Sequence, residues 1–353
     1  MSLRERFWLP DPGLLGERLA GYVALRPRFG QVRQIGRSFS GRPIHAACYG
    51  AGRQKVIYVN ALHGWEVVAT NSAMAFVWSL FSGKGLDGED LSGLVEEVAR
   101  QQTVWALPLC SPDVAARQYE RFPEGFFPNA IGMKTREDWL HYAHVMNDPF
   151  EHYTGNLIAG QYHGFTREQV LQWLNAHRYL GQRWSDQGVD VWVDFERFES
   201  PEACAVRDFV LEGGPDCVME YHGHEGATFV TAPTPRAGSE KASRQVMFAR
   251  RMVAALVATG IKCATEPVNL YLTKESANFV NWIDTRFPEA MMLFAELQMY
   301  QNEWIERQRG ARPAFAPAGR PMLTQEEIIR SGWTLSMALL EQGNTRSLYQ
   351  NLA

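Results

Sequence analysis

The sequence predicts a three-layer α/β/α protein in which helices cover both faces of a mixed, mostly parallel β-sheet. Two observations support this fold class. Four short runs are apolar on both alternating faces, as strands buried on both sides of a parallel sheet are. Segments with helical periodicity lie between these runs, which is typical of α/β proteins. The runs are Val56–Ala61, Val104–Leu109, Cys217–Tyr221 and Met291–Leu297.

Helical periodicity predicts the elements between and after these strands. A helix over Thr70–Phe81 follows the first strand directly. A longer helix over Ser239–Thr259 is expected to end at Gly260, which stands at a C-cap position. The last helix is expected to begin at the capping box Thr324–Glu327 and to end at about Gln342.

Two segments differ from this pattern. Residues 118–187 are rich in aromatic and polar residues and contain two capping boxes, at Thr135–Asp138 and Thr166–Gln169. We interpret them as a partly helical insertion, either a lid that shapes a substrate site or a surface elaboration without such a role. Residues 310–353 are expected to form a C-terminal linker, Gly310–Met322, and the last helix.

Composition limits the classes of function. The 353 residues are 46% hydrophobic, which predicts one domain over 1–353 with a large core. The net charge of −4 has no blocks of one sign, so we expect no binding to nucleic acid or to a membrane. The 5 cysteines contain no CxxC pair, and residues 1–10 lack the apolar core of a signal peptide. These features predict a soluble cytoplasmic protein with reduced cysteines.

The first apolar run leads into His63-Gly64-Trp65-Glu66, at the predicted carboxyl end of a strand. Ligands of open parallel sheets gather at this edge. A His-x-x-Glu pair at a strand-to-helix turn can place an imidazole nitrogen and a carboxylate about 2.0–2.2 Å from one zinc ion. The motif is common by chance, so it is the position at a strand end that favours a metal site.

A second imidazole follows the third apolar run, in Tyr221-His222-Gly223-His224. Two histidines and one glutamate would leave the fourth zinc position to water, which is typical of catalytic zinc. The alternative is that His222 and His224 are hydrogen-bonded polar residues at a strand end, without a metal.

The fourth run contains one acid, Glu296. Burying an unpaired carboxylate is costly, so Glu296 requires a metal, a cation or a catalytic role. A carboxylate facing a zinc-bound water can take its proton and pass it to a leaving amine. The alternative is an ion pair with an arginine. Together the three strand ends predict a hydrolase with one Zn²⁺ per chain, bound by His63, Glu66 and His222.

These residues resemble motifs of the zinc carboxypeptidases of the carboxypeptidase A type. His63–Glu66 is similar to the family's HG-x-E, and Phe294–Leu297 is similar to ftiEl, whose glutamate is the general base. Tyr221–His224 resembles the lHGH of the cytosolic carboxypeptidase branch, in which the first histidine binds zinc. Further similarities are Gln34–Ile44 to iG-S-x-x-GRpi, Ser111–Asp113 to NPDG and Ser200–Ala203 to s-x-PE-a.

The resemblance implies a zinc carboxypeptidase-like fold and a single catalytic domain that hydrolyses a peptide through water activated by Glu296. It places the carbonyl-polarising arginine at Arg117 or Arg121, between which spacing does not decide. It also implies substrate contacts by Tyr271 and, as the second imidazole of the His-Gly-His segment, by His224.

One departure concerns the family's GVDLNRNF, whose Asn-Arg pair grips the substrate carboxylate. Here Gly188-Val189-Asp190 is followed by Val191-Trp192-Val193, so the pair is absent in the direct register. A shifted register would place Glu196 and Arg197 there, which makes Arg197 the candidate for binding the carboxylate. Two alternatives therefore stand. One is a zinc amidohydrolase of N-acyl amino acids or of γ-glutamyl or cell-wall peptides, resembling succinylglutamate desuccinylase and aspartoacylase, and the other is a non-catalytic binding module.

Overall fold

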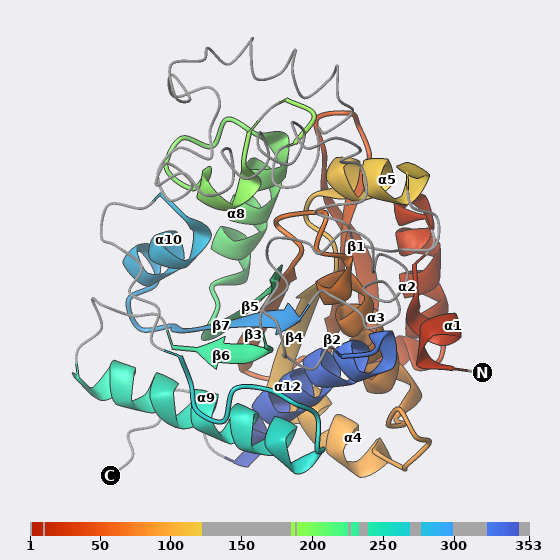
Figure 1. Ribbon diagram of the computed structural model, residues 1–353, viewed down its shortest axis with the longest axis vertical. Helices are drawn as coiled ribbons and strands as arrows, with labels where there is room; N and C mark the ends of the chain where they lie inside the picture. Colours follow the sequence, from red (N-terminus) through yellow and green to blue (C-terminus); the bar gives the residue numbers. More distant parts are fainter. Residues whose placement is uncertain are drawn as a thin grey trace, which may run out of the picture.

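The computed structural model describes residues 2–9, 11–121, 185–187, 189–224, 227–232, 239–268, 277–298 and 323–345. Its centre is a seven-stranded sheet with the order β1-β2-β4-β3-β5-β7-β6 (Figure 1). The strands are β1 (Gly30–Arg37), β2 (Pro43–Tyr49), β3 (Gln54–Asn60), β4 (Gln102–Leu107), β5 (Cys217–His224), β6 (Phe229–Thr231) and β7 (Met291–Gln298).

The sheet is mixed, as predicted. Its four central strands, β4-β3-β5-β7, are parallel, and they are the four strands that the apolar runs predicted. The outer strands β1, β2 and β6 are antiparallel to their neighbours and were not predicted. Strand β1 is only half-buried and β6 has three residues, so neither forms a continuous apolar run.

Helices cover both faces of the sheet. Elements α2, α3, α4, α9 and α12 contribute to the core on one face, and α8, α10 and η4 contribute to the core on the other. The helices are α1 (Leu3–Phe7), α2 (Leu15–Val23), α3 (Val67–Ser82), α4 (Ser92–Gln101), α5 (Pro112–Arg121), α8 (Pro201–Gly213), α9 (Ser239–Ala258), α10 (Phe279–Arg286) and α12 (Gln325–Thr345). Short 3-10 turns are η1 (Pro12–Leu14), η2 (Pro27–Phe29) and η4 (Val191–Val193).

The three predicted helices are confirmed as α3, α9 and α12. Helix α9 is followed by Gly260 with a φ of 77°, the left-handed conformation expected of a C-cap glycine. Helix α12 begins after the predicted capping box, in which Glu327 N donates to Thr324 Oγ1 at 3.2 Å and Thr324 N donates to Glu327 Oε2 at 2.7 Å. Of the predicted insertion 118–187, residues 118–121 form the end of α5, and residues 122–184 lie outside the described residues. The predicted linker 310–322 lies outside them as well.

Alternation along the central strands separates the two cores. In β3, Tyr58 belongs to the core under α3 and α12, whereas Val59 belongs to the core under α8 and α10. In β5, Val218 faces the α8 and α10 side, so Glu220 and His222 are placed on that side as well. Phe294 places Glu296 of β7 on the same side. The chemistry-bearing residues therefore share one face of the sheet.

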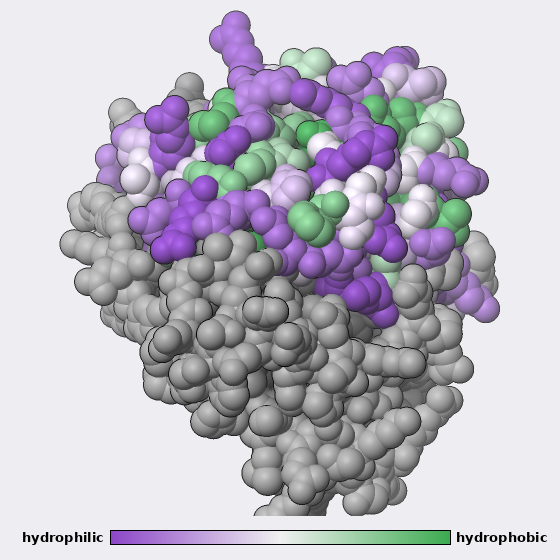
Figure 2. All heavy atoms as spheres, turned by 90° about the horizontal axis from the view of Figure 1, so that it is seen from above, coloured by the Kyte–Doolittle hydropathy of each residue, from purple (hydrophilic) through white to green (hydrophobic). Residues whose placement is uncertain are grey.

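The surface of the described residues carries its large hydrophobic side chains singly. Exposed examples are Leu14, Leu25, Phe39, Leu211 and Val257, which come from different parts of the chain. Figure 2 shows the molecule from above, and the described part of that face is largely hydrophilic, with small hydrophobic groups between the hydrophilic ones. Within the described chain, none of the helices combines the length and apolarity needed to span a bilayer.

Three of the motif segments meet at the turn between β1 and β2. The buried carboxylate of Asp113 accepts hydrogen bonds from Ser38 Oγ at 2.6 Å and from Ser40 N at 2.9 Å. Glu202, at the start of α8, accepts one from Phe39 N at 3.2 Å. These acids therefore hold the β1–β2 turn against α5 and α8, which is a structural role.

Glu202 should make stability depend on pH. Burial raises the pKa of Glu202 to about 7, against 4.5 for an exposed glutamate. The folded state thus binds the proton more tightly than the unfolded state, and stability should fall as pH rises from about 4.5 to about 7. Between pH 4.5 and pH 8, the free energy of unfolding in urea should fall by on the order of 2–3 kcal/mol less in Glu202→Gln than in wild type. Glu17→Gln, on the exposed side of α2, is the control, and identical pH profiles for wild type and Glu202→Gln would contradict the prediction.

The turn between β3 and α3 packs closely against the segment that follows β4. Cys110 N donates to Asn60 O and Ser111 N donates to Ala61 O, both at 3.2 Å. A Cβ atom on Gly64 would lie 2.0 Å from the Ser111 carbonyl oxygen. Only glycine fits at this position without movement of the backbone, so the packing fixes the turn that carries His63 and Glu66.

Gly64→Ala should therefore destabilise the protein, by about 1–3 kcal/mol, because a neighbouring backbone must move. Gly21→Ala is a matched control, since a Cβ atom on Gly21 of α2 meets nothing within 4 Å. That change should stabilise by about 0.5–1 kcal/mol. The free energy of unfolding in urea measures both, and a Gly64→Ala protein as stable as wild type would show that the turn is not closely packed.

Candidate metal centre

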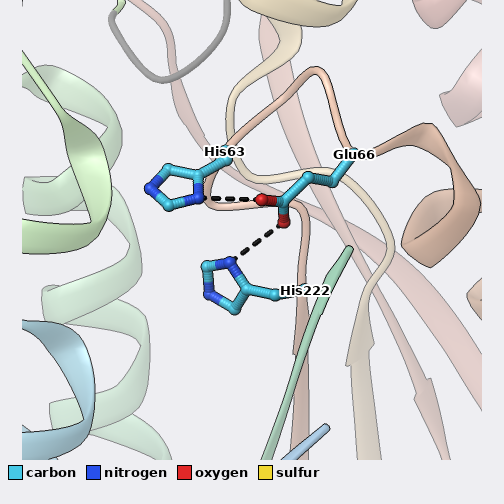
Figure 3. Close-up of side chains that lie close together, drawn as sticks. All are labelled: His63, Glu66 and His222. Atoms are coloured by element: carbon cyan, nitrogen blue, oxygen red, sulfur yellow. Dashed lines mark hydrogen bonds and ion pairs between the residues drawn. The ribbon is translucent and has the colours of Figure 1, made fainter. Parts of the chain in front are cut away.

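Glu66 lies between two imidazole rings, one from the turn after β3 and one from β5 (Figure 3). Its Oε1 is 2.9 Å from His63 Nδ1, and its Oε2 is 3.0 Å from His222 Nδ1. His63 and Glu66 lie on the turn after β3, and His222 lies near the carboxyl end of the adjacent parallel strand β5. The structure thus brings together the three residues that the sequence singled out as zinc ligands.

The three side chains are almost fully buried, with exposed fractions of 4%, 2% and 3% for His63, Glu66 and His222. One ligand atom from each lies within 4.8 Å of the others, a separation that suits a shared metal ion. Two imidazole nitrogens and one carboxylate form the donor set that zinc prefers when one position is left to water. The residues present therefore fit a zinc ion.

The electrostatics of the cluster favour positive charge at its centre. Burial alone would raise the pKa of Glu66, but His222 and His63 outweigh it and lower that pKa to about 2. Burial alone would lower the pKa of His222, yet Glu66 and Glu220 raise it well above its usual value. The pKa of His63 is raised against the same burial effect by Asp190 and Glu66. Carboxylates thus dominate the surroundings of both rings.

Asp190 holds the far side of His63. Its Oδ1 is 3.2 Å from His63 Nε2 and also accepts a hydrogen bond from Trp192 N at 3.0 Å, which caps η4. A carboxylate at this nitrogen leaves Nδ1 for a metal. Asp190 was not among the predicted site residues. The available signal was its place as the third residue of Gly188-Val189-Asp190, the segment similar to the start of the family's GVDLNRNF.

Glu220 holds the far side of His222. Its Oε1 is 2.7 Å from His222 Nε2, and the residue is fully buried. Glu220 was not among the predicted site residues, although it is an acid within the apolar run Cys217–Tyr221. The structure shows Glu296 to be half-buried, so the cost of burying a carboxylate is larger for Glu220 than for Glu296.

Glu296 lies beside the cluster. It is opposite His222 in the parallel register of β5 and β7, and the alternation of β7 places it on the same face of the sheet. Neighbouring strands are about 4.8 Å apart, so a substrate group at His222 would be close to Glu296. All three predicted strand ends therefore contribute to one location.

Aromatic rings enclose the imidazoles. The ring of the half-buried Trp192 lies edge-on at 5.8 Å from His63 and at 5.5 Å from His222. Phe294 stacks on His222 with ring centres 5.1 Å apart. These rings make the site apolar around its charged centre, which strengthens the interactions of any ion bound there.

Two of the predicted arginines have carboxylate partners in the structure. Arg117 forms an ion pair with Asp186. Arg197 has a half-exposed side chain 3.8 Å from Glu199. Their proposed roles, in polarising a carbonyl and in binding a substrate carboxylate, stay predictions. The side chains of Arg121 and His224, and the whole of Tyr271, lie outside the described residues.

Comparisons with known proteins address the fold. No family model and no curated protein matches the sequence. Among solved structures, a metallo-carboxypeptidase from Burkholderia cenocepacia is 17% identical and matches with a TM-score of 0.60, covering 93% of this chain and 69% of that one.

Two further solved structures have a similar fold. A metallo-carboxypeptidase from Pseudomonas aeruginosa in complex with (2-guanidinoethylmercapto)succinic acid is 13% identical, with a TM-score of 0.55 and coverage of 94% of this chain and 69% of that chain. The carboxypeptidase A from Helicoverpa armigera is 14% identical, with a TM-score of 0.55 and coverage of 93% and 72%, respectively. The protein therefore has the α/β fold of the zinc carboxypeptidases.

Proposed function

We propose that the protein is a zinc-dependent peptidase that hydrolyses an amide bond as a carboxypeptidase. The observation that carries this proposal is the buried cluster of His63, Glu66 and His222, with Glu296 on the neighbouring strand. The structural neighbours support it, because those named above are described as metallo-carboxypeptidases or as a carboxypeptidase A. The similarity of Tyr221–His224 to the cytosolic carboxypeptidase branch belongs to the proposal as well.

In this proposal His63, Glu66 and His222 hold the zinc ion. When bound, zinc supplies a Lewis acid that polarises a carbonyl and lowers the pKa of a water. Glu296 would take a proton from the attacking water and return it to the leaving amine. The surrounding aromatic rings would keep bulk water from the reacting groups. Asp190 would hold His63 in the orientation that this arrangement needs.

One observation favours a second candidate function. Trp192 packs against both imidazoles and Val193 is buried, so neither offers a charged partner to a substrate carboxylate. Those are the positions at which the resemblance places the Asn-Arg pair. This favours a zinc amidohydrolase that acts on N-acyl amino acids or on γ-glutamyl or cell-wall peptides. Under the carboxypeptidase proposal, Arg197 remains the candidate for that carboxylate, because its planar guanidinium suits one.

Replacing Glu296 should separate metal binding from catalysis. Glu296→Gln keeps the shape of the side chain but cannot accept the proton, so amide hydrolysis should fall about 10²–10⁴-fold while zinc stays at about one per chain. Elemental analysis and hydrolysis assays of wild type and variant measure this. Glu289→Gln, an exposed residue just before β7, is the control and should keep full activity.

The outcomes of that experiment distinguish the possible functions. A wild type that is free of metal after purification without chelator would contradict the zinc proposal. Zinc-loaded wild type without activity on any amide substrate would instead indicate a binding module.

A substrate panel tests the carboxypeptidase assignment. Peptides with a free C-terminus should be hydrolysed faster than the same peptides with a C-terminal amide, because a charged hydrogen bond would be lost. The expected loss in kcat/KM is about 10–100-fold, from the roughly 1.5–3 kcal/mol of such a bond. Equal rates on both peptides, with faster turnover of N-acyl amino acids or γ-glutamyl peptides, would favour the amidohydrolase.

A further inference from the structure

We propose that Glu220 is a positioning residue of the metal site, which orients His222 so that its Nδ1 faces the ion and which strengthens the binding of that ion. This inference rests on the proposed function, because it assumes a metal between His63, Glu66 and His222. Neither the sequence motifs nor the comparisons assign a role to Glu220.

The geometry fixes both nitrogens of the His222 ring. Nε2 is 2.7 Å from Glu220 Oε1, and Nδ1 is 3.0 Å from Glu66 Oε2. An imidazole that donates its Nε2 proton to a carboxylate presents its lone pair at Nδ1. Because Glu220 occupies Nε2, only Nδ1 is available to an ion, and Nδ1 is the atom that faces Glu66.

Glu220 is a buried carboxylate whose burial costs free energy, and it has one hydrogen-bond partner among the described residues, His222. Glu220 has no exposed surface, and its strand neighbours in the sheet are Val59 and Phe294 of the α8 and α10 core. Removing a carboxylate from water costs several kcal/mol. Within the described part of the chain its Oε2 accepts no hydrogen bond, so His222 is the partner that stabilises it. Positive charge at His222 would offset that cost, and a metal ion at Nδ1 would supply it.

The two nitrogens of the His63 ring have the same kinds of partner, which supports a metal-binding role for both rings. Its Nδ1 faces Glu66 and its Nε2 lies 3.2 Å from Asp190. Both imidazoles thus turn the same nitrogen inward and are backed by a carboxylate on the other. Asp190 also caps η4, so its replacement would disturb the chain locally. Among the described residues Glu220 has no such second hydrogen bond, which makes it the better residue to test.

The test compares zinc affinity in wild type and Glu220→Gln, measured by competition with a chromophoric chelator. The amide can still accept a hydrogen bond from Nε2, but it carries no charge. We expect zinc to bind about 10–100-fold more weakly. The thermal stability of the metal-free protein should not fall, because a buried charge has been removed. Glu220→Asp, which keeps the charge with a shorter reach, should recover part of the affinity and serves as the test if Glu220→Gln does not fold.

Asp284→Asn provides a matched control. Asp284 is a buried carboxylate as well, but it pairs with Lys241 at 2.8 Å on the helices α9 and α10. Asp284→Asn should lower stability, because the buried ammonium of Lys241 loses its charged partner, and it should leave zinc affinity unchanged. If wild type and Glu220→Gln bind zinc with equal affinity, the role of Glu220 is overturned while the zinc proposal stays intact. Wild type that binds no zinc would overturn the proposed function and this inference with it.

Discussion

The carboxylate of Glu66, held between the Nδ1 atoms of His63 and His222, is the interaction on which the site depends. It is 2% exposed, so its charge has to be balanced by groups within the protein. The balance requires β3 and β5 to be parallel neighbours, because only then do the turn after β3 and the end of β5 meet at one edge of the sheet. It also requires the close approach of Gly64 to Ser111, which positions that turn.

Around this centre the charges are arranged in shells. Glu66 occupies the middle, the two imidazoles flank it, and Asp190 and Glu220 lie behind the imidazoles. These three carboxylates leave excess negative charge even with both rings protonated. A divalent ion in place of the two inner protons carries the same two positive charges, but it places them directly beside Glu66 and leaves both rings neutral, so the buried acids keep a cationic partner at their centre. The aromatic rings of Trp192 and Phe294 keep the local dielectric low, so each of these terms is large.

The sequence predicted the parts of the fold whose pattern is unambiguous. Strands β3, β5 and β7 are buried on both faces and read as apolar runs, and the helices α3 and α12 have clear periodicity or caps. Strand β1 was missed because half of its residues face water, so it lacks such a run. The meeting of the His63 turn with His222 was predictable because parallel strands end at the same edge of a sheet.

The outer carboxylates were harder to predict than the inner cluster. Which ring nitrogen faces Asp190 or Glu220 depends on the register between strands and on side-chain rotamers, neither of which spacing encodes. Arg117 pairs with Asp186, a partner 69 positions away that belongs to none of the motifs. Long-range partners of this kind follow from the tertiary structure and not from local pattern.

X-ray absorption at the zinc edge of the purified protein tests the central claim most directly, because it reports the atoms bound to the ion. The account predicts one zinc per chain with only nitrogen and oxygen ligands, at about 2.0–2.2 Å. Sulfur ligands at about 2.3 Å, which would come from the cysteines, would contradict it. Zinc-free protein after purification without chelator would contradict it as well.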